Sequence, residues 1–350
     1  MRRAAWLLSL SACATLADGT PGLENPPGAQ AGPFRALKTG ELGQGRVAPN
    51  AISGSDAQAF MRDPSIVDSD GDSATLGVEG YFAASIEEAE VDAPAIRIVR
   101  TTALDGRSFD RSVEIVLEIQ HAWEGDHLGA PSVVVGDGGE RLLFYEADRG
   151  IGLARASGAT AAFESGAEPV FSRADVEWAS AELKSPGIVR LFDDSFRLYF
   201  ETESDGVPVI GVARSDDGET FGDPQIVLAA THDDDDVDGA YVGAPQAVTA
   251  VSGQGRQIVY VYYTAQNSAG KQSIAMAARF LEEEGEALGR SGSSMYSPAG
   301  SVQPREPSVI RFDDFSFLFT TQRTAKNTPD PVVIVAVSPG DLELPAPEPQ

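Results

Sequence analysis

A short phrase returns five times along this chain of 350 residues: a loop ending in Xaa-Pro, an apolar strand, a turn and an aromatic-rich strand. The prolines that open the five copies are Pro64, Pro131, Pro186, Pro245 and Pro307, so they lie 67, 55, 59 and 62 residues apart. Such an interval is in the range of the longer propeller-blade repeats and leaves room for about four short strands in each copy. The repeat predicts an all-β fold, a five-bladed β-propeller.

The second strand of each copy alternates aromatic and aliphatic residues, as expected when a sheet face packs against the next blade. In the last four copies these strands are predicted over 141–146, 196–201, 257–263 and 315–320. A third apolar strand follows in every copy. We therefore expect a propeller that extends from residue 60 to residue 344.

The first residues have a different character. Residues 1–12 carry Arg2 and Arg3 and then an apolar run too short to span a bilayer, which is typical of a secretory signal peptide. The run ends in Leu10-Ser-Ala-Cys13, which resembles the bacterial lipobox, where the cysteine receives the lipid. Cys13 is the only cysteine, so it has no disulfide partner. We expect a lipoprotein of the cell envelope, anchored at Cys13 in the outer membrane; a plain signal peptide is the alternative.

Two further segments lie outside the predicted propeller. Residues 13–59 are rich in Gly, Pro, Ala and Ser without a sustained apolar pattern, and they predict a flexible tether that follows the lipidated cysteine. Residues 345–350 predict a disordered tail. A closing strand for the ring could come from residues 34–37 or equally from residues 341–344.

The charge of the chain limits its partners. With 53 acidic and 26 basic residues, the formal net charge is -27. Such a surface repels phosphate backbones and anionic headgroups, so we expect no nucleic-acid partner and membrane attachment through the lipid alone. Simple solubility of an exported protein explains the charge equally well. Nothing in the sequence indicates an obligate oligomer, so a monomer is expected.

The five-copy layout and the phrase Asp63-Pro64-Ser-Ile-Val resemble the five-bladed glycoside hydrolases of family 43 and its relatives, which act on arabinan, xylan and fructan. The stretch 211–221 also resembles a strand-and-turn phrase that is frequent in these propellers. The resemblance covers about residues 60 to 340 and implies the propeller fold.

The resemblance also implies three catalytic carboxyl groups, of which this chain keeps one. The general base of the family matches Asp63. The aspartate that tunes the acid would follow the proline of the second copy, where this chain has Ser132, and the general acid would stand at Lys184. A serine cannot tune a carboxyl group by like-charge repulsion, and a lysine cannot act as the general acid without a large pKa shift. Glu182 could replace the acid only if the loop register slips.

A different carboxylate set remains open. Glu306 precedes the proline of the fifth copy as Asp63 precedes that of the first, and the two copies become neighbours when the ring closes. We predict that these carboxylates face each other over one funnel, as a functional pair or as capping and ion-pairing groups. The candidate catalytic residues are thus Asp63, Glu306 and Glu182, with Asp126 as a further partner.

Loops expected at the same rim carry aromatic and acidic residues. An aromatic face can stack on a sugar ring while acids accept hydrogen bonds from its hydroxyl groups. The candidate ligand-binding residues are Trp123, Asp126, His127, Trp178 and Tyr241.

The same rim carries an acidic run that could bind a metal. Asp233, Asp235 and Asp238 could collect Ca²⁺, although the run lacks the spacing of an EF-hand and a solvated acidic loop is the alternative. Three scattered histidines and one cysteine argue against zinc.

Two functions remain from these observations. The first is a carbohydrate-binding or envelope-protein-binding propeller without hydrolase machinery, which the missing carboxyl groups favour. The second is a glycoside hydrolase that acts on polysaccharide with a shifted carboxylate pair around Asp63. The identity of the sugar or protein partner stays open.

Overall fold

The computed structural model describes residues 31–38, 41, 50–52, 58–69, 74–87, 95–110, 112–136, 138–252, 255–300, 302–323, 332–340 and 342. Cys13, the rest of the leader and the predicted tail lie outside the described residues, so the lipidation of Cys13 stays a prediction. Among the described residues no helix is long and apolar enough to cross a membrane.

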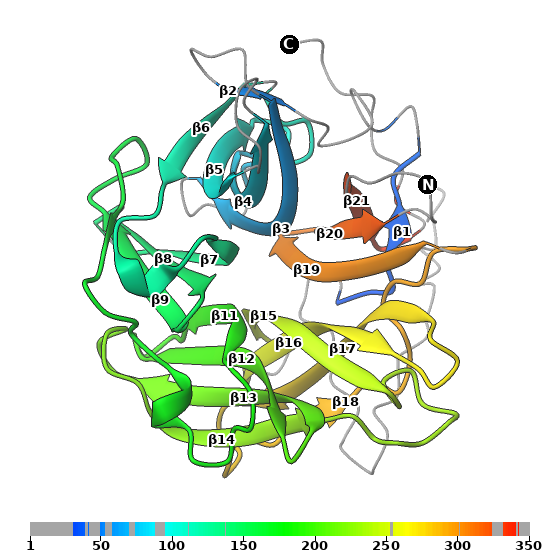
Figure 1. Cartoon of the computed structure of the whole chain (residues 1–350). Coiled ribbons are helices and arrows are strands. Elements are labelled where there is room, and N and C mark those ends of the chain that lie inside the picture. Colours follow the sequence, from blue (N-terminus) through cyan, green and yellow to red (C-terminus); the bar gives the residue numbers. More distant parts are fainter. Residues whose placement is uncertain are drawn as a thin grey trace, which may run out of the picture.

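Five sheets, antiparallel apart from one short parallel pairing in blade one, stand around a common centre, which confirms the predicted five-bladed propeller (Figure 1). The first two blades contain β3 (Gln58–Asp68), β4 (Val78–Glu87), β5 (Ala95–Ala103) and β6 (Ser112–Leu117), then β7 (Gly129–Val135), β8 (Arg141–Ala147), β9 (Gly150–Ala156) and β10 (Glu164–Ser165). The third and fourth contain β11 (Lys184–Arg190), β12 (Phe196–Ser204), β13 (Val207–Ser215) and β14 (Gly222–Ala229), then β15 (Tyr241–Val251), β16 (Gln257–Gln266), β17 (Gln272–Phe280) and β18 (Gly289–Arg290). Two short 3₁₀ helices, η1 (Ala122–Glu124) and η2 (Arg173–Asp175), lie in loops.

The fifth blade closes with a strand from the N-terminal part of the chain. It contains β19 (Gln303–Arg311), β20 (Ser316–Arg323) and β21 (Val332–Ser338), and β1 (Arg35–Ala36) pairs with the outer edge of β21. Of the two closing segments considered from sequence, residues 34–37 thus supply the strand. A second early strand, β2 (Asn50–Ile52), pairs with both β3 and β6 in blade one. Parts of the predicted tether therefore belong to the propeller.

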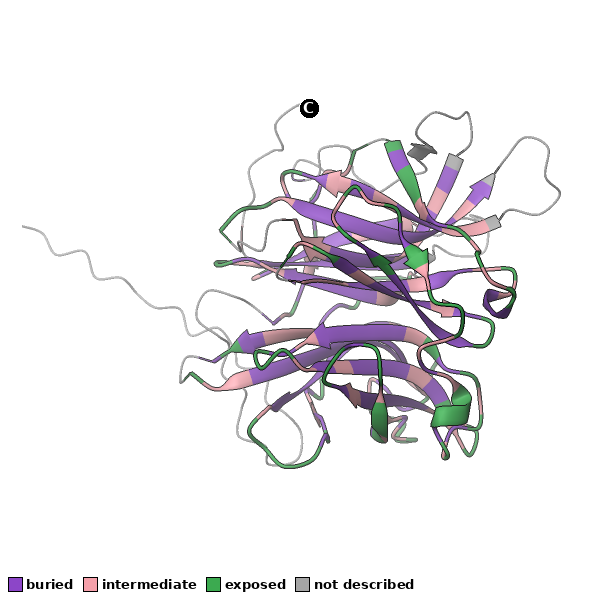
Figure 2. Cartoon of the chain, turned by 90° about the vertical axis from the view of Figure 1, so that its left-hand side faces the viewer, coloured by how far each residue is buried: buried purple, intermediate pink, exposed green. Residues whose placement is uncertain are grey.

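The hydrophobic core lies between the blades. The second strand of each blade carries the large apolar side chains that pack against the neighbouring blade. The largest fully buried side chains are aromatic and come mainly from β4, β8, β12, β16 and β20. In a side view the buried residues follow the middle of the strands and the exposed ones lie mostly in loops (Figure 2). The aromatic residues that repeat in the sequence therefore form the packing between the blades.

Each innermost strand has a β-bulge at its Xaa-Pro step. The residues before the five prolines all have positive φ: Asp63 (51°), Ala130 (41°), Ser185 (47°), Ala244 (45°) and Glu306 (55°). The strand pairing shifts at the same step in all five blades. A bulge leaves a residue without a ladder partner, and proline suits the next position because it has no N–H group to leave unpaired. The repeated proline thus marks a bulge at the centre of the ring.

A ring of hydrogen bonds joins the innermost strands one step beyond the prolines. In four of the five blades the residue after the proline accepts a hydrogen bond from the backbone of the next blade: Ser65 from Val133 N, Ser132 from Ile188 N, Gln246 from Val309 N and Ser308 from Ile66 N. Blade three has Gly187 at this position, and its Cα lies against the carbonyl of Pro245. This ring gives Ser132, which stands where the resemblance implied an aspartate, a structural role.

Candidate functional site: the central funnel

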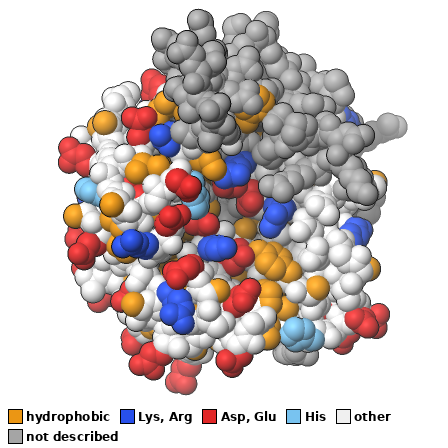
Figure 3. All heavy atoms as spheres, viewed as in Figure 1, with side chains coloured by type: hydrophobic (Ala, Val, Ile, Leu, Met, Phe, Trp, Pro, Cys, Tyr) orange, Lys and Arg blue, Asp and Glu red, His pale blue; other side chains and the backbone are white. Residues whose placement is uncertain are grey.

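The five bulges form the floor of a funnel at the centre of one face of the ring. The funnel has a volume of about 260 Å³ and narrows onto a channel of about 30 Å³ between the prolines. It is lined by Arg62, Asp63, Ala130, Glu146, Lys184, Ser185, Glu201, Tyr241, Ala244, Arg305, Glu306 and Thr321. In the view along the ring axis, Lys and Arg side chains gather toward the centre among acidic ones, while acidic side chains prevail at the outer edge (Figure 3).

Most carboxylates of the funnel are bound to a backbone N–H group of a bulge. Glu146 accepts from Ser185 N and Glu201 from Ala244 N, each at 2.9 Å. The hydroxyl groups of Thr264 and Thr321 accept in the same way from Glu306 N in blade five and Asp63 N in blade one. All four acceptors occupy one position near the end of the second strand.

Blade one lacks this acceptor, because the equivalent position on β4 is Ala83. Its place is taken by Asp63, whose Oδ2 accepts from Ala130 N at 3.2 Å. Asp63 Oδ2 also lies 3.6 Å from Arg62 Nε. The one family-like catalytic carboxylate of this chain therefore holds the bulge of blade two.

Asp63 and Glu306 come together, as predicted from their positions before the prolines of adjacent blades. The buried Oε2 of Glu306 has no hydrogen-bond donor within reach among the described residues. Burial raises the pKa of Glu306 well above its usual value, and the adjacent Asp63 carboxylate raises it further. The raised pKa favours the protonated form of Glu306, whose O–H group donates a hydrogen bond to the Asp63 carboxylate. Two carboxyl groups in hydrogen-bonding contact are too close to flank a glycosidic bond, which requires a separation of about 5 to 9 Å.

The raised pKa of Glu306 predicts a pH-dependent loss of stability. Above the unfolded-state pKa of about 4.5 the unfolded chain releases this proton while the folded protein retains it, so the free energy of unfolding falls as pH rises toward the folded pKa. The fall reaches at most about 1.4 kcal/mol per pH unit. Glu306→Gln removes this contribution. Urea unfolding at pH 5 and pH 8 should show the variant gaining stability relative to the wild type at pH 8; equal pH dependence in both proteins contradicts the shared proton.

Position 184, where the resemblance placed the general acid, carries an exposed lysine on the funnel wall. Glu182, the proposed replacement, is exposed and does not line the funnel, so the required register slip does not occur. Glu146 instead lies beside this position, bonded to Ser185 N. Burial raises the pKa of Glu146, with a smaller contribution from Glu201, while Lys184 and His127 oppose the rise.

Of the two tryptophans expected at the rim, Trp123 is buried and Trp178 is partly buried against the core. Trp123 is 7% exposed, stacks on Tyr145 and donates its Nε1–H to Gly166 O. Trp178 stacks on Phe200 and donates to Pro224 O. The burial of Trp123 leaves it no free face for a sugar, whereas ligand binding by the partly exposed Trp178 stays a prediction. Tyr241 does line the funnel, and its hydroxyl group donates to Glu201 Oε1 at 2.7 Å.

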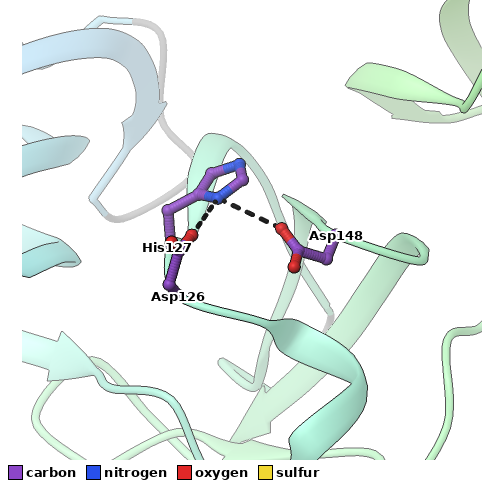
Figure 4. A group of neighbouring side chains, drawn as sticks. All are labelled: Asp126, His127 and Asp148. Carbon is purple, nitrogen blue, oxygen red and sulfur yellow. Dashed lines mark hydrogen bonds and ion pairs between the residues drawn. The ribbon is translucent and has the colours of Figure 1, made fainter.

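Asp126 and His127 meet a third residue, Asp148, beside blade two (Figure 4). His127 Nδ1 lies 3.0 Å from Asp126 Oδ1 and 3.3 Å from Asp148 Oδ1. The contact with Asp126 is a hydrogen bond and that with Asp148 is an ion-pair contact, and Asp126 is almost fully exposed. Whether this group takes part in ligand binding stays a prediction.

The acidic run before blade four does not gather its carboxylates at one point. Asp238 is buried, and its Oδ2 accepts from Tyr263 Oη at 2.8 Å and from Arg290 Nε at 2.9 Å. Asp233 and Asp235 are exposed, and Asp233 Oδ1 accepts from Asp235 N in a turn. The calcium site predicted from Asp233, Asp235 and Asp238 is therefore corrected to a turn followed by a buried ion pair.

Sequence reasoning missed Glu146 and Glu201, which were assigned only to packing strands. A signal was present: both end an aromatic stretch, as Phe-Tyr-Glu146 and Tyr-Phe-Glu201. A polar residue that recurs in one column of a repeat at the end of an apolar strand points toward the ring centre. Aligning the second strands as well as the prolines would have placed them in the funnel.

Comparison with solved structures agrees with this architecture. The chain is similar to a thermostable family-43 glycoside hydrolase, with 16% identity, a TM-score of 0.62, and coverage of 87% of this chain and 100% of that one. It is also similar to a structure described for the GH130 family of mannoside phosphorylases, which contains glycoside hydrolases that target β-1,2 mannosidic linkages in Candida mannan (14% identity, TM-score 0.64, coverage 93% and 99%). These likenesses show the fold alone.

A glycosyl hydrolase from Bacteroides ovatus gives a similar result, with 14% identity, a TM-score of 0.63, and coverage of 90% and 96%. No family model and no curated protein matches the sequence. The chain thus has a glycoside hydrolase-like propeller fold, and its activity has to be argued from its own funnel.

Proposed function

We propose that this protein is a non-catalytic, carbohydrate-binding propeller of the bacterial cell envelope. The observation that carries the proposal is the state of the funnel carboxylates. Asp63, Glu146 and Glu201 hold bulge amides, and Glu306 shares a proton with Asp63. Lys184 stands on the funnel wall at the position where the general acid was expected. An intact propeller with such a funnel is what a binding relative of the hydrolases would have.

The dimensions of the funnel favour the end of a sugar chain. Its volume of about 260 Å³ is slightly below the range of about 300 to 1,000 Å³ in which small-molecule pockets fall. The channel beneath it, of about 30 Å³, holds no more than a water molecule or two. A terminal sugar unit therefore enters the funnel from one side and does not pass through it.

Calorimetric titration of the purified protein with a panel of arabino-, xylo-, fructo- and manno-configured oligosaccharides tests this function. At least one should bind, and the mixture should contain no new reducing ends. Asp63→Asn should weaken binding about tenfold or more, because it removes the charge that holds Arg62 and the bulge amide of Ala130 in the funnel, and a hydrogen bond to a charged group contributes about 1.5 to 3 kcal/mol. Asp216→Asn, in an exposed turn of blade three, is the matched control and should change nothing. Absence of binding across the panel contradicts the proposal.

A second candidate function is glycoside hydrolysis with Asp63 as base and Glu146 as acid. A Cβ atom at Gly129 would lie 3.8 Å from Glu146 Cβ and 4.0 Å from Asp63 Oδ2, so the two residues are neighbours on the funnel wall. The raised pKa of Glu146 is the property a general acid needs. Its bond to Ser185 N argues for the structural role.

The cellular context is part of the proposal. Cys13 would carry the lipid that attaches the protein to the outer membrane, and the acidic surface would keep nucleic acid away. Metabolic labelling with a fatty-acid analogue should modify the wild type and leave Cys13→Ala unlabelled. Labelling of the variant would contradict the anchor. A protein of the envelope is the other partner class that such a propeller could bind, and a monomer is expected.

A further inference from the structure

The funnel is unusually rich in cations for this chain. Three of its twelve lining residues are basic, Arg62, Lys184 and Arg305, whereas the whole chain has 26 basic residues in 350 and a net charge of -27. Four lining residues are acidic. They neutralise the cations only where their oxygens are not already bound to other groups.

The acidic groups are largely occupied. Both oxygens of Glu201 accept hydrogen bonds, one from Tyr241 Oη at 2.7 Å and one from Ala244 N at 2.9 Å. Asp63 takes the ion pair with Arg62 and the bond from Ala130 N. The raised pKa of Glu306 favours its neutral, protonated form.

Two of the cations, in contrast, keep free donors. Lys184 is exposed and forms no ion pair within 4 Å among the described residues, although its cross-strand partner is Glu201. Arg305 lies beside the Tyr241 hydroxyl group and forms no ion pair within 4 Å among the described residues, and its guanidinium group carries five N–H donors. Because Tyr241 is bonded to Glu201, and Glu201 lies opposite Lys184, both cations lie around the same Glu201–Tyr241 pair.

We propose that Lys184 and Arg305 bind the carboxylate of an acidic sugar, so that the terminal unit recognised in the funnel is a uronic acid. This inference rests on the proposed carbohydrate-binding function and names its ligand class. A lysine supplies a point charge and an arginine supplies a planar fork that matches a carboxylate. The partly buried wall of the funnel screens this attraction less than open solvent does.

Titration of the full-length protein with D-glucuronic and D-galacturonic acid, against glucose and galactose, tests the inference. One uronic acid should bind about tenfold or more tightly than its neutral counterpart. Lys184→Gln and Arg305→Gln should each remove most of that difference. Arg155→Gln, on an exposed ion pair with Glu219, is the matched control and should have no effect. Thermal melting should show that the Lys184 variant remains folded, since this side chain is exposed.

Other results separate the two proposals. Equal binding of neutral and acidic sugars, unaffected by Lys184→Gln, overturns the uronate assignment and leaves the binding function in place. Galactose 6-sulfate that binds as tightly as galacturonic acid shows that charge alone is recognised, which also overturns the carboxylate assignment. Absence of binding to every sugar, neutral or acidic, overturns the binding function itself.

Discussion

Gly187→Ala is expected to destabilise the propeller by about 3 kcal/mol, at the upper end of what overpacking usually costs. A Cβ atom at this position would lie 2.3 Å from the carbonyl oxygen of Pro245 and 3.0 Å from its carbonyl carbon. Both atoms belong to the backbone of the next bulge, so no side-chain rotation can relieve the overlap. The expected result is a lower midpoint in urea with an unchanged denaturant slope.

The matched control is Gly129→Ala on the innermost strand of blade two. Its Cβ would meet Glu146 Cβ at 3.8 Å and Asp63 Oδ2 at 4.0 Å, which are ordinary contacts. Since alanine also restricts the unfolded chain, this variant should be as stable as the wild type or slightly more stable. Similar losses of stability in Gly187→Ala and Gly129→Ala would show that the close approach of blades three and four is not what makes alanine unfavourable at position 187.

Arg141→Met is expected to lower the free energy of unfolding by about 3 kcal/mol. Arg141 Nη2 lies 2.6 Å from Glu79 Oε1 across the interface of blades one and two, and both side chains are about 95% buried. Removing one partner leaves a buried charge, which typically costs about 3 to 5 kcal/mol. The lower end applies here because Tyr81 Oη still donates to Glu79 and Arg100 Nε remains 3.7 Å away. Urea unfolding at pH 7 measures the loss.

An exposed pair with the same separation provides the control. Arg155 Nη2 lies 2.6 Å from Glu219 Oε1, and these side chains are 44% and 62% exposed. Arg155→Met should therefore cost less than about 1 kcal/mol. If the two substitutions cost the same, burial is not what gives the Glu79–Arg141 pair its importance.

The blade count could be predicted from sequence because the ring repeats one local solution. Each copy needs a bulge beside the axis, and proline at that bulge leaves a visible mark at intervals of about 60 residues. The closing strand was harder to assign, since residues 34–37 and 341–344 have similar short apolar patterns. Pairing with β21 decided it, and pairing depends on contacts between distant segments.

The site was only partly predictable. The contact between Asp63 and Glu306 follows from two equivalent positions in adjacent blades, which sequence spacing reveals. The positions of the Trp123 and Trp178 side chains do not follow from spacing, because an aromatic residue in a loop before a blade can point toward solvent or pack against the blade. Nor could spacing show that Asp238 bonds Arg290, a residue 52 positions away. Side-chain direction in loops depends on tertiary packing that no local pattern encodes.

Single-turnover hydrolysis tests the central claim most directly. The protein, in excess over a fluorescently labelled oligosaccharide that it binds, is incubated for hours and the products are separated. We predict that the substrate is recovered intact, because the funnel carboxylates are held by backbone amides and a shared proton. Cleavage by the wild type that disappears in both Asp63→Asn and Glu146→Gln would contradict the account and identify the funnel as the active site of a glycoside hydrolase.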